Sequence, residues 1–144
     1  MQTDIERAQP DDVTDLLRLL EQNQLPGAGL QHHIGTALVA RQNGQLVGSA
    51  ALEVYPDGAL LRSVAVAPAL HGRGLGHNLT DAAILLAREL RSPAVYLLTT
   101  TAERFFPKFG FERIARSDVP ASVQTSIEFT SACPSSATVM RKTL

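Results

Sequence analysis

The segment from residue 63 to residue 76 constrains the fold of this chain more than any other. A β-branched apolar run stops at Pro68, a short loop carries Gly72, Gly74 and Gly76, and an amphipathic helix then begins. Glycine lets the backbone come close to a ligand, and the free amides of the first helical turn point toward that ligand. The sequence therefore predicts a strand, a glycine-rich turn and a helix start that together bind an anion, most naturally a phosphate group.

The spacing of the glycines decides which of three known phosphate-binding loop patterns this segment fits. A loop of the form G-x-x-x-x-G-K-[ST] is excluded because no glycine here precedes a lysine. The dinucleotide fingerprint G-x-G-x-x-G fits Gly72 and Gly74, but His77 stands where its third glycine belongs. A pyrophosphate loop of the form [Q/R]-x-x-G-x-[G/A] fits Gly74 and Gly76, with His71 in the first place. A plain strand-to-helix turn without a ligand stays open as the alternative.

A second motif lies one predicted helix and one predicted strand beyond this loop. Residues 102–111 read Ala-Glu-Arg-Phe-Phe-Pro-Lys-Phe-Gly-Phe, close to the pattern A-x-x-[FY]-Y-x-K-x-G-F. The two motifs in this order resemble the acyl-CoA-binding signatures of the GNAT superfamily of N-acetyltransferases, and the resemblance covers nearly the whole chain. Within that superfamily the chain is most similar to acetyltransferases of arsenic-resistance operons, through residues 60–66, residues 96–103 and the tail from Glu128 to Ala137.

The resemblance implies the GNAT fold, an α/β (α+β) architecture. In this fold a mixed, mostly antiparallel sheet of six or seven strands carries helices on both faces, and residues 1–144 are expected to form one such domain. Periodicity predicts helices over 11–22, 76–91 and 102–108, and strands over 37–41, 46–55, 59–67, 94–98, 111–115 and 137–141. Asn43-Gly44 predicts a hairpin turn, and residues 56–58 predict a three-residue loop.

Composition narrows the partners and the compartment. A chain of 144 residues can bury a core without metals or disulfides. A formal net charge of −1 and the lack of a basic cluster argue against a nucleic-acid partner. Cys133 is the one cysteine and no apolar run has the length of a membrane span, so a cytoplasmic protein without membrane attachment is expected. No metal site is expected, because His32 and His33 lack further converging ligands.

By the resemblance, the cosubstrate is acetyl-CoA, and two stretches of the chain hold it. The backbone of residues 64–66 pairs with the pantetheine arm as an added strand would, and the amides of residues 73–77 bind the pyrophosphate. The residues expected to contact the cofactor are Val64, Ala65, Val66, His71, Gly72, Arg73, Gly74, Leu75, Gly76, His77, Thr101, Phe105, Phe106 and Lys108.

The chain departs from the family pattern at the group that protonates the leaving thiolate. Phe106 stands where many members have a tyrosine, and a phenyl ring cannot donate a proton. The proton must then come from water, from the substrate itself, or from a hydroxyl such as Ser63 or Thr100. Thr101 is expected to cap the helix over 102–108.

The base and the anchor for the acceptor are expected on two neighbouring strands. A three-residue loop at 56–58 would place Glu53 opposite Leu61, on the face of Ser63. Arg62 would then point to the other face, unless a bulge changes the alternation. Arg62 stands where many relatives carry an acid, and a guanidinium there is expected to bind a carboxylate or oxyanion of the acceptor. Glu53 is then the expected base, with a surface ion pair as the alternative.

The expected function is transfer of an acetyl group from acetyl-CoA to the amine of a small molecule. Arg62 favours an acceptor with an acidic group, such as an amino acid or an amino-acid-like toxin, and the arsenic context follows from the resemblance alone. Two alternatives stay open. One is an acyl-CoA-binding module or sensor with little or no turnover, suggested by the missing tyrosine. The other is acetylation of a protein amine, which the near-neutral charge does not support. A homodimer is compatible with the resemblance.

Overall fold

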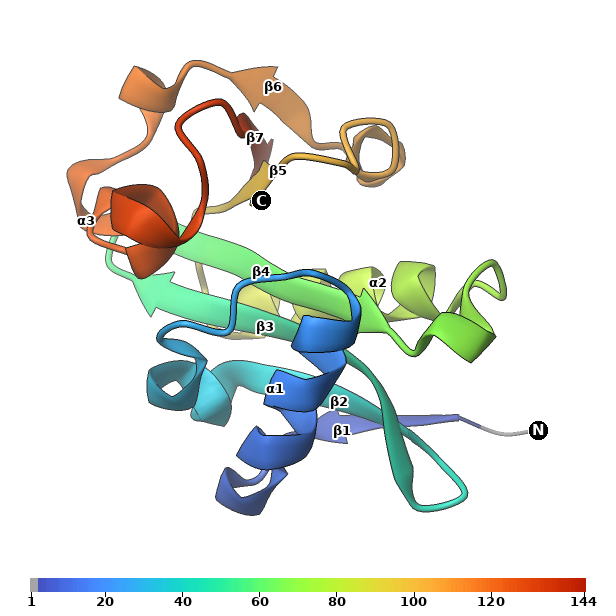
Figure 1. Ribbon diagram of the computed structural model, residues 1–144. Coiled ribbons are helices and arrows are strands. Elements are labelled where there is room, and N and C mark those ends of the chain that lie inside the picture. Colours follow the sequence, from blue (N-terminus) through green and yellow to red (C-terminus); the bar gives the residue numbers. More distant parts are fainter. Residues whose placement is uncertain (1–2) are drawn as a thin grey trace.

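In the computed structural model, the described residues 3–144 form one mixed sheet with helices on both faces, as expected from the sequence (Figure 1). The strand order across the sheet is β1-β2-β3-β4-β5-β7-β6. The strands are β1 (Asp4–Arg7), β2 (Ala37–Gln42), β3 (Gln45–Tyr55), β4 (Gly58–Val66), β5 (Ala94–Thr99), β6 (Glu112–Ile114) and β7 (Thr138–Thr143). The α-helices are α1 (Val13–Gln22), α2 (Leu75–Glu89) and α3 (Ala121–Gln124). The connections contain the 3-10 turns η1 (Pro10–Asp12), η2 (Leu30–Thr36), η3 (Pro68–Leu70), η4 (Phe106–Phe109) and η5 (Arg116–Asp118), and the π turn η6 (Glu128–Ala132).

The sheet is antiparallel throughout except between β4 and β5. Parallel strands need a long crossover connection, and the segment that contains α2 supplies it. This parallel pairing is short, since it joins only Ala59 to Val95 and Leu60 to Tyr96. The sheet is therefore held together in its middle by few backbone hydrogen bonds.

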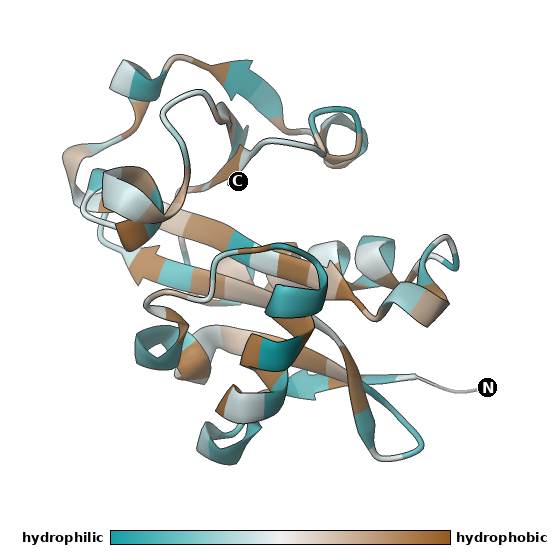
Figure 2. Cartoon of the chain, viewed as in Figure 1, coloured by the Kyte–Doolittle hydropathy of each residue, from teal (hydrophilic) through white to brown (hydrophobic). Residues whose placement is uncertain are grey.

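Two layers of helices cover the sheet, with α1 on one face and α2 on the other (Figure 1). Leu79, Ala83 and Ala87 of α2 recur at helical spacing and are buried against the strands. Leu16 and Leu20 of α1 belong to a separate core on the opposite face. Figure 2 shows hydrophobic residues along β4 at the centre and hydrophilic residues on β6 and in the hairpin turn between β2 and β3. None of the helices within residues 3–144 is long and apolar enough to cross a membrane.

A bulge in β4 changes the face of the sheet toward which the following side chains point. β3 advances from Ala51 to Ser49 while β4 advances from Arg62 to Ala65, so β4 holds one residue more. Ser63 lies in this bulge with a φ of 59°, a left-handed value that is uncommon outside glycine. As a result, Arg62 and Ala65 both face the side of the sheet that α1 covers.

The predicted register of the β3–β4 hairpin was wrong by one residue. Tyr55 pairs with Gly58 and Glu53 with Leu60, so the turn contains two residues and not three. Glu53 and Arg62 therefore share one face of the sheet, diagonally across the hairpin, without help from the bulge. The sequence predicted Gly58 as the last residue of the loop. In the structure Gly58 is buried and is the first residue of β4.

The predicted helix over 102–108 was also wrong, because only the short turn η4 forms. Pro107 lacks the amide that an α-helical bond at this position needs, and the turn closes with Gly110 N donating to Pro107 O at 3.0 Å. The predicted cap by Thr101 is also absent, since η4 begins after Phe105 without a side-chain cap, and the loop before it is held by Thr99. The Thr99 Oγ1 atom accepts a hydrogen bond from Ala102 N at 2.9 Å.

Gly58 is tightly enclosed where β4 begins, and this generates a stability prediction. A Cβ added there would lie 2.7 Å from Tyr96 Cε2 and 3.1 Å from Ala94 O. Gly58→Ala is therefore expected to lower the free energy of unfolding by about 1–3 kcal/mol, as overpacking does, measured by urea denaturation. Gly35→Ala is the matched control, since a Cβ there meets nothing within 4 Å, and it should change stability by less than about 0.5 kcal/mol. Equal losses in the two variants would contradict the packing argument.

Candidate active site

A cavity occupies the fork where β4 and β5 separate. Their pairing ends at Leu60 and Tyr96, beyond which β4 continues on β3 while β5 continues on β7. The cavity has a volume of about 840 Å³, and its walls include residues 61–66 of β4 and residues 97–101 in and after β5. Backbone groups at diverging strand edges no longer bond to each other, so they are available to a ligand that lies between them.

The glycine-rich turn and the start of α2 form one part of the cavity wall. Gly72 and Gly74 have left-handed φ angles of 80° and 83°, which glycine adopts without steric cost. In α2, Asn78 N donates to Gly74 O at 3.1 Å. The amides of residues 75–77 precede this first α-helical bond, so they have no partner within the helix. Free amides at the start of a helix are the groups that bind an anion, and residues 75–77 line the cavity.

Nearly all residues expected to hold the cofactor line this one cavity. The exception is Arg73, whose exposed side chain lies outside the lining. His71 lines the cavity, but its Nε2 atom lies 2.7 Å from Val66 O, so the ring fastens the turn to the end of β4. The expected residues found in the lining are Val64, Ala65, Val66, His71, Gly72, Gly74, Leu75, Gly76, His77, Thr101, Phe105, Phe106 and Lys108.

Phe106 is buried and packs against two other aromatic rings. Its ring centroid lies 5.0 Å from that of Phe105 and 5.8 Å from that of Phe111, in both cases edge-on. This geometry is typical of packing aromatics. Neither of the two tyrosines lines the cavity, whereas the hydroxyl residues Ser63 and Thr100 both do.

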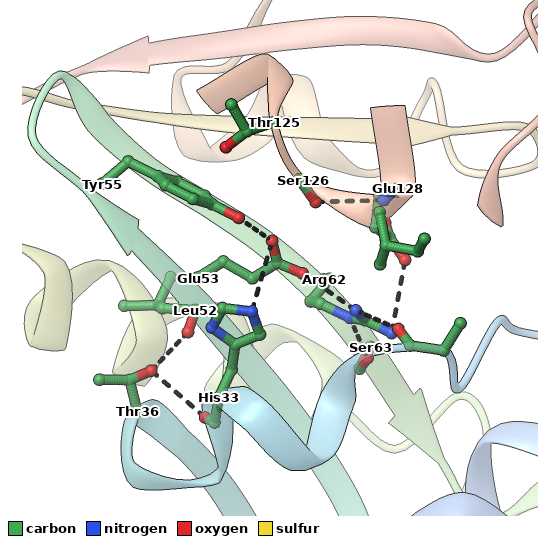
Figure 3. Close-up of polar contacts among 12 residues, drawn as sticks. His33, Thr36, Leu52, Glu53, Tyr55, Arg62, Ser63, Thr125, Ser126 and Glu128 are labelled. Carbon is green, nitrogen blue, oxygen red and sulfur yellow. Dashed lines mark hydrogen bonds and ion pairs between the residues drawn. The ribbon is translucent and has the colours of Figure 1, made fainter. Parts of the chain in front are cut away.

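Arg62 lies in the cavity wall with a fully buried side chain, and its guanidinium contacts several segments (Figure 3). Nη1 donates to Glu53 Oε2 at 2.9 Å and to Ala28 O at 2.7 Å. Nη2 donates to Pro26 O at 3.0 Å, and Nε donates to Ser63 Oγ at 3.1 Å. The guanidinium therefore ties β3 and β4 to the loop that precedes η2.

Glu53 is buried beside Arg62 and does not line the cavity. Tyr55 donates its hydroxyl proton to Glu53 Oε1 at 2.5 Å, and His33 Nε2 lies 3.7 Å from the same oxygen (Figure 3). Burial by itself raises the pKa of Glu53, but hydrogen bonds from Ser126, Tyr55 and Arg62 outweigh burial and lower the pKa. The enclosed, ionised carboxylate has the geometry of an ion-pair partner.

Glu128 is a cavity residue that sequence reasoning missed as a functional group. It is the first residue of η6, is 4% exposed, and places Oε2 3.6 Å from Arg62 Nη2 (Figure 3). Burial raises the pKa of its carboxyl, and the opposing charge of Arg62 does not cancel this shift. The sequence signal was present in the tail motif that contains Glu128 and Cys133, but nothing in that motif indicated Arg62 as the spatial neighbour.

Cys133 lies beside Glu128 and is bound to it. Cys133 Sγ donates to Glu128 Oε1 at 3.6 Å. Burial, followed by the charge of Glu128, raises the pKa of this thiol to about 12, so it stays protonated and is a poor nucleophile. Within residues 3–144, no group of three or more His, Cys, Asp and Glu side chains is arranged to hold a metal ion.

The Glu53–Arg62 pair generates a prediction about stability and pH. Glu53→Gln should lower the free energy of unfolding by about 3–5 kcal/mol at pH 7, because it leaves the buried guanidinium with one carboxylate fewer. The lowered pKa means that Glu53 contributes stability above its unfolded-state pKa of about 4.3 and loses this contribution as the pH falls through the lower folded value. Urea denaturation across this range should show the gap between variant and wild type narrowing in acid.

The exposed Glu112 supplies the control for this measurement. Glu112→Gln should change stability by less than about 0.5 kcal/mol at either pH. A gap between wild type and Glu53→Gln that stays constant from pH 7 into the acid range would show that the charge of Glu53 does not stabilise the fold.

The chain is similar in sequence to a known domain family and to two longer proteins. Residues 33–113 match the acetyltransferase (GNAT) domain family. The chain is 41% identical to an amino-acid acetyltransferase of Mycobacterium tuberculosis over 81 residues, which are 56% of this chain and 46% of that protein. It is 30% identical to an amino-acid acetyltransferase of Ralstonia nicotianae over 130 residues, covering 82% of this chain and 29% of that protein. The chain thus spans less than half the length of these two relatives.

Solved structures share the fold over the full length of the chain. Rv2747 from Mycobacterium tuberculosis, in complex with CoA and NLQ, has a TM-score of 0.82 and 28% identity, with 98% of this chain and 99% of that chain covered. N-acetylglutamate synthase from Neisseria gonorrhoeae, complexed with coenzyme A and N-acetyl-glutamate, has a TM-score of 0.85 and 21% identity, with 100% of this chain and 35% of that chain covered. Because the family match spans more than half of the chain and the fold agrees with it, this chain belongs to the GNAT family of acetyltransferases.

Proposed function

We propose that this chain transfers an acetyl group from acetyl-CoA to the amine of an amino acid. One observation carries the proposal: a single cavity joins a helix-start anion site, a fork of unpaired strand edges and the Arg62–Glu128 pair. An extended cofactor that carries phosphates needs the first two features, and an acceptor with a carboxylate and an amine suits the third. The relatives support this, since they include amino-acid acetyltransferases and structures that hold CoA.

The cofactor would lie along the fork in the manner of an added strand. Its pantetheine amides would bond to the backbone of residues 64–66, where β4 has lost its neighbour β5. Its pyrophosphate would accept hydrogen bonds from the amides of residues 75–77. Lys108 is exposed, lines the cavity, and holds its ammonium 4.5 Å from the centroid of the Phe105 ring, so it adds positive charge for the phosphates.

Acetyl transfer further requires an oxyanion donor and a proton for the leaving sulfur. A backbone N–H of the diverging β4 edge would stabilise the oxyanion of the tetrahedral intermediate. Phe106 cannot protonate the thiolate, so the proton would come from Thr100, Ser63 or water. Ser63 Oγ accepts a hydrogen bond from Arg62 Nε, which leaves the hydroxyl proton of Ser63 to be donated elsewhere.

Phe106 is also the observation that favours a second candidate function. Since a phenyl ring occupies the place of the usual tyrosine and no tyrosine lines the cavity, the chain could bind acyl-CoA without turning it over. Such a binding module would share the cofactor site and differ only in the absence of chemistry. The two functions therefore separate in an assay that measures binding and turnover side by side.

Acetyl-CoA binding and turnover test the proposal directly. Acetyl-CoA at 100 times its Kd should stabilise the fold by about 2.7 kcal/mol, seen as a rise in Tm. Release of CoA thiol should appear with L-amino acids in a panel that also contains arsenical and phosphinate amino acids, polyamines and aminoglycosides. A rise in Tm with no thiol release from any acceptor would favour the binding module, and no rise in Tm would contradict both functions.

Lys108 allows a test of the phosphate end alone. Lys108→Ala should raise the Kd for acetyl-CoA by up to about fivefold at low salt, because an exposed charge pair contributes at most about 1 kcal/mol. Screening should shrink this difference at high salt. Arg113→Ala, which removes an exposed cation outside the cavity lining, should leave the Kd unchanged. Titration calorimetry at two salt concentrations measures both variants, and a salt-independent effect of Lys108→Ala would contradict a phosphate contact.

A further inference from the structure

Glu128 lines the cavity, and among residues 3–144 its carboxylate has only weak partners. Its Oε2 atom lies 3.6 Å from Arg62 Nη2, which is longer than a hydrogen bond. Its Oε1 atom meets only the weak thiol donor of Cys133, also at 3.6 Å. This carboxylate therefore retains acceptor capacity on the side that lines the cavity.

Arg62 retains one donor next to this carboxylate. A guanidinium has five N–H donors. Nε and both donors of Nη1 are used by Ser63, Glu53 and Ala28, and one donor of Nη2 is used by Pro26 O. The remaining N–H of Nη2 has only the long contact to Glu128. This fully buried N–H and the nearly buried carboxylate of Glu128 thus lie side by side, each without a close partner, and both residues line the cavity.

The charges of this cluster leave one negative charge to be balanced. The ion pair of Arg62 with Glu53 is close, at 2.9 Å, and the lowered pKa of Glu53 keeps it ionised. The charged and titratable groups that act on Glu128 are Arg62, Glu53 and Cys133. Once Glu53 has neutralised Arg62, an ionised Glu128 makes the cluster negative. A cation of the acceptor, such as an ammonium group, would restore neutrality there.

We infer that Arg62 and Glu128 together bind the zwitterionic end of an α-amino acid, and that Glu128 accepts the proton of its ammonium group. The free N–H of Nη2 donates to the acceptor carboxylate, and the carboxylate of Glu128 accepts from the ammonium. This inference rests on the proposed function and adds which side chain binds each group of the amino acid and which one takes its proton. It assigns Glu128, and not Glu53, as the base.

The separation of the pair suits such an acceptor. An α-amino acid carries its ammonium and its carboxylate on one carbon, so the two groups lie next to each other as Nη2 and Oε2 do across their 3.6 Å gap. Two hydrogen bonds of about 2.8 Å would bridge the gap without pulling the pair apart. An amine without a carboxylate leaves the Nη2 donor unused, and an acid without an amine places its carboxylate beside that of Glu128.

The proton and electron changes balance with this assignment. Glu128 takes one proton from the ammonium and frees the nitrogen lone pair, which forms the N–C bond to the thioester carbonyl. When the tetrahedral intermediate collapses, the C–S bond breaks and the electron pair leaves with sulfur. The second nitrogen proton reaches the thiolate to give the CoA thiol, and Glu128 returns its proton to solvent. The raised pKa of Glu128 favours this role, because a base works best when its pKa lies nearer the working pH.

The experiment compares wild type with Glu128→Gln, Glu128→Asp and the control Thr130→Ala, which changes an exposed residue of the same turn η6. Glu128→Gln should lower kcat/KM for amino acids at least about 100-fold, the lower range for loss of a general base. The KM for acetyl-CoA should stay within twofold. The wild-type rate should rise with pH as Glu128 ionises, and this acid limb should be lost in Glu128→Gln and recovered in Glu128→Asp.

A matched acceptor series separates recognition from proton transfer. Wild type should prefer an L-amino acid to the amine that lacks its carboxylate and to its amide. Unchanged turnover and pH profile in Glu128→Gln, or an equal preference for the three acceptors in wild type, would overturn the inference while the proposed function stands. A wild type that turns over no amino acid overturns the proposed function and the inference with it. A loss of Tm and acetyl-CoA affinity in both Glu128 variants would identify a structural role and overturn it as well.

Discussion

The buried guanidinium of Arg62 is the interaction on which the acceptor side of this site depends. It binds Glu53 of β3, two carbonyls of the loop before η2, and the bulge residue Ser63, and it lies beside Glu128 of η6. Burying charges costs several kcal/mol per ion unless hydrogen bonds replace the lost water. Here nearly all the guanidinium donors have partners, so one side chain fixes strands, loop and turn relative to each other. Because Glu53 already pairs closely with Arg62, the carboxylate of Glu128 has no close ionic partner.

A second constraint is the divided pairing of the two central strands. β4 is held by β3 and β5 is held by β7, while their own pairing joins only Ala59 to Val95 and Leu60 to Tyr96. The fork that results leaves backbone groups without partners inside the sheet, where unpaired groups are costly. A ligand that can bond like a strand removes this cost, which is why an extended cofactor suits the position. The glycine-rich turn then places the start of α2 along the same cavity.

Much of the fold could be predicted because the deciding signals are local. Apolar runs separated by the Asn43-Gly44 turn and by residues 56–58 predict the meander of β2, β3 and β4. Helical spacing predicts α1 and α2, and all these bounds agree within one or two residues. Local reasoning failed where one residue decides between two structures. Gly58 joins β4 and not the turn, which moves the register by one. Pro107 reduces an expected helix to η4, and the hydroxyl of Thr99, not that of Thr101, holds the loop before it.

The sequence by itself pointed to the family through its resemblance. It also placed the strand, the glycine-rich turn and the helix start that line the cavity, since glycines at fixed spacing act through the backbone within a few residues. Only the tertiary structure decided which side chains meet around Arg62. Side chains on a strand alternate between faces, so a register that is uncertain by one residue leaves open whether Glu53 and Arg62 meet. Glu128 reaches the same cluster from η6, far along the chain. No local pattern encodes such a contact, because it depends on how the last third of the chain folds back over β4.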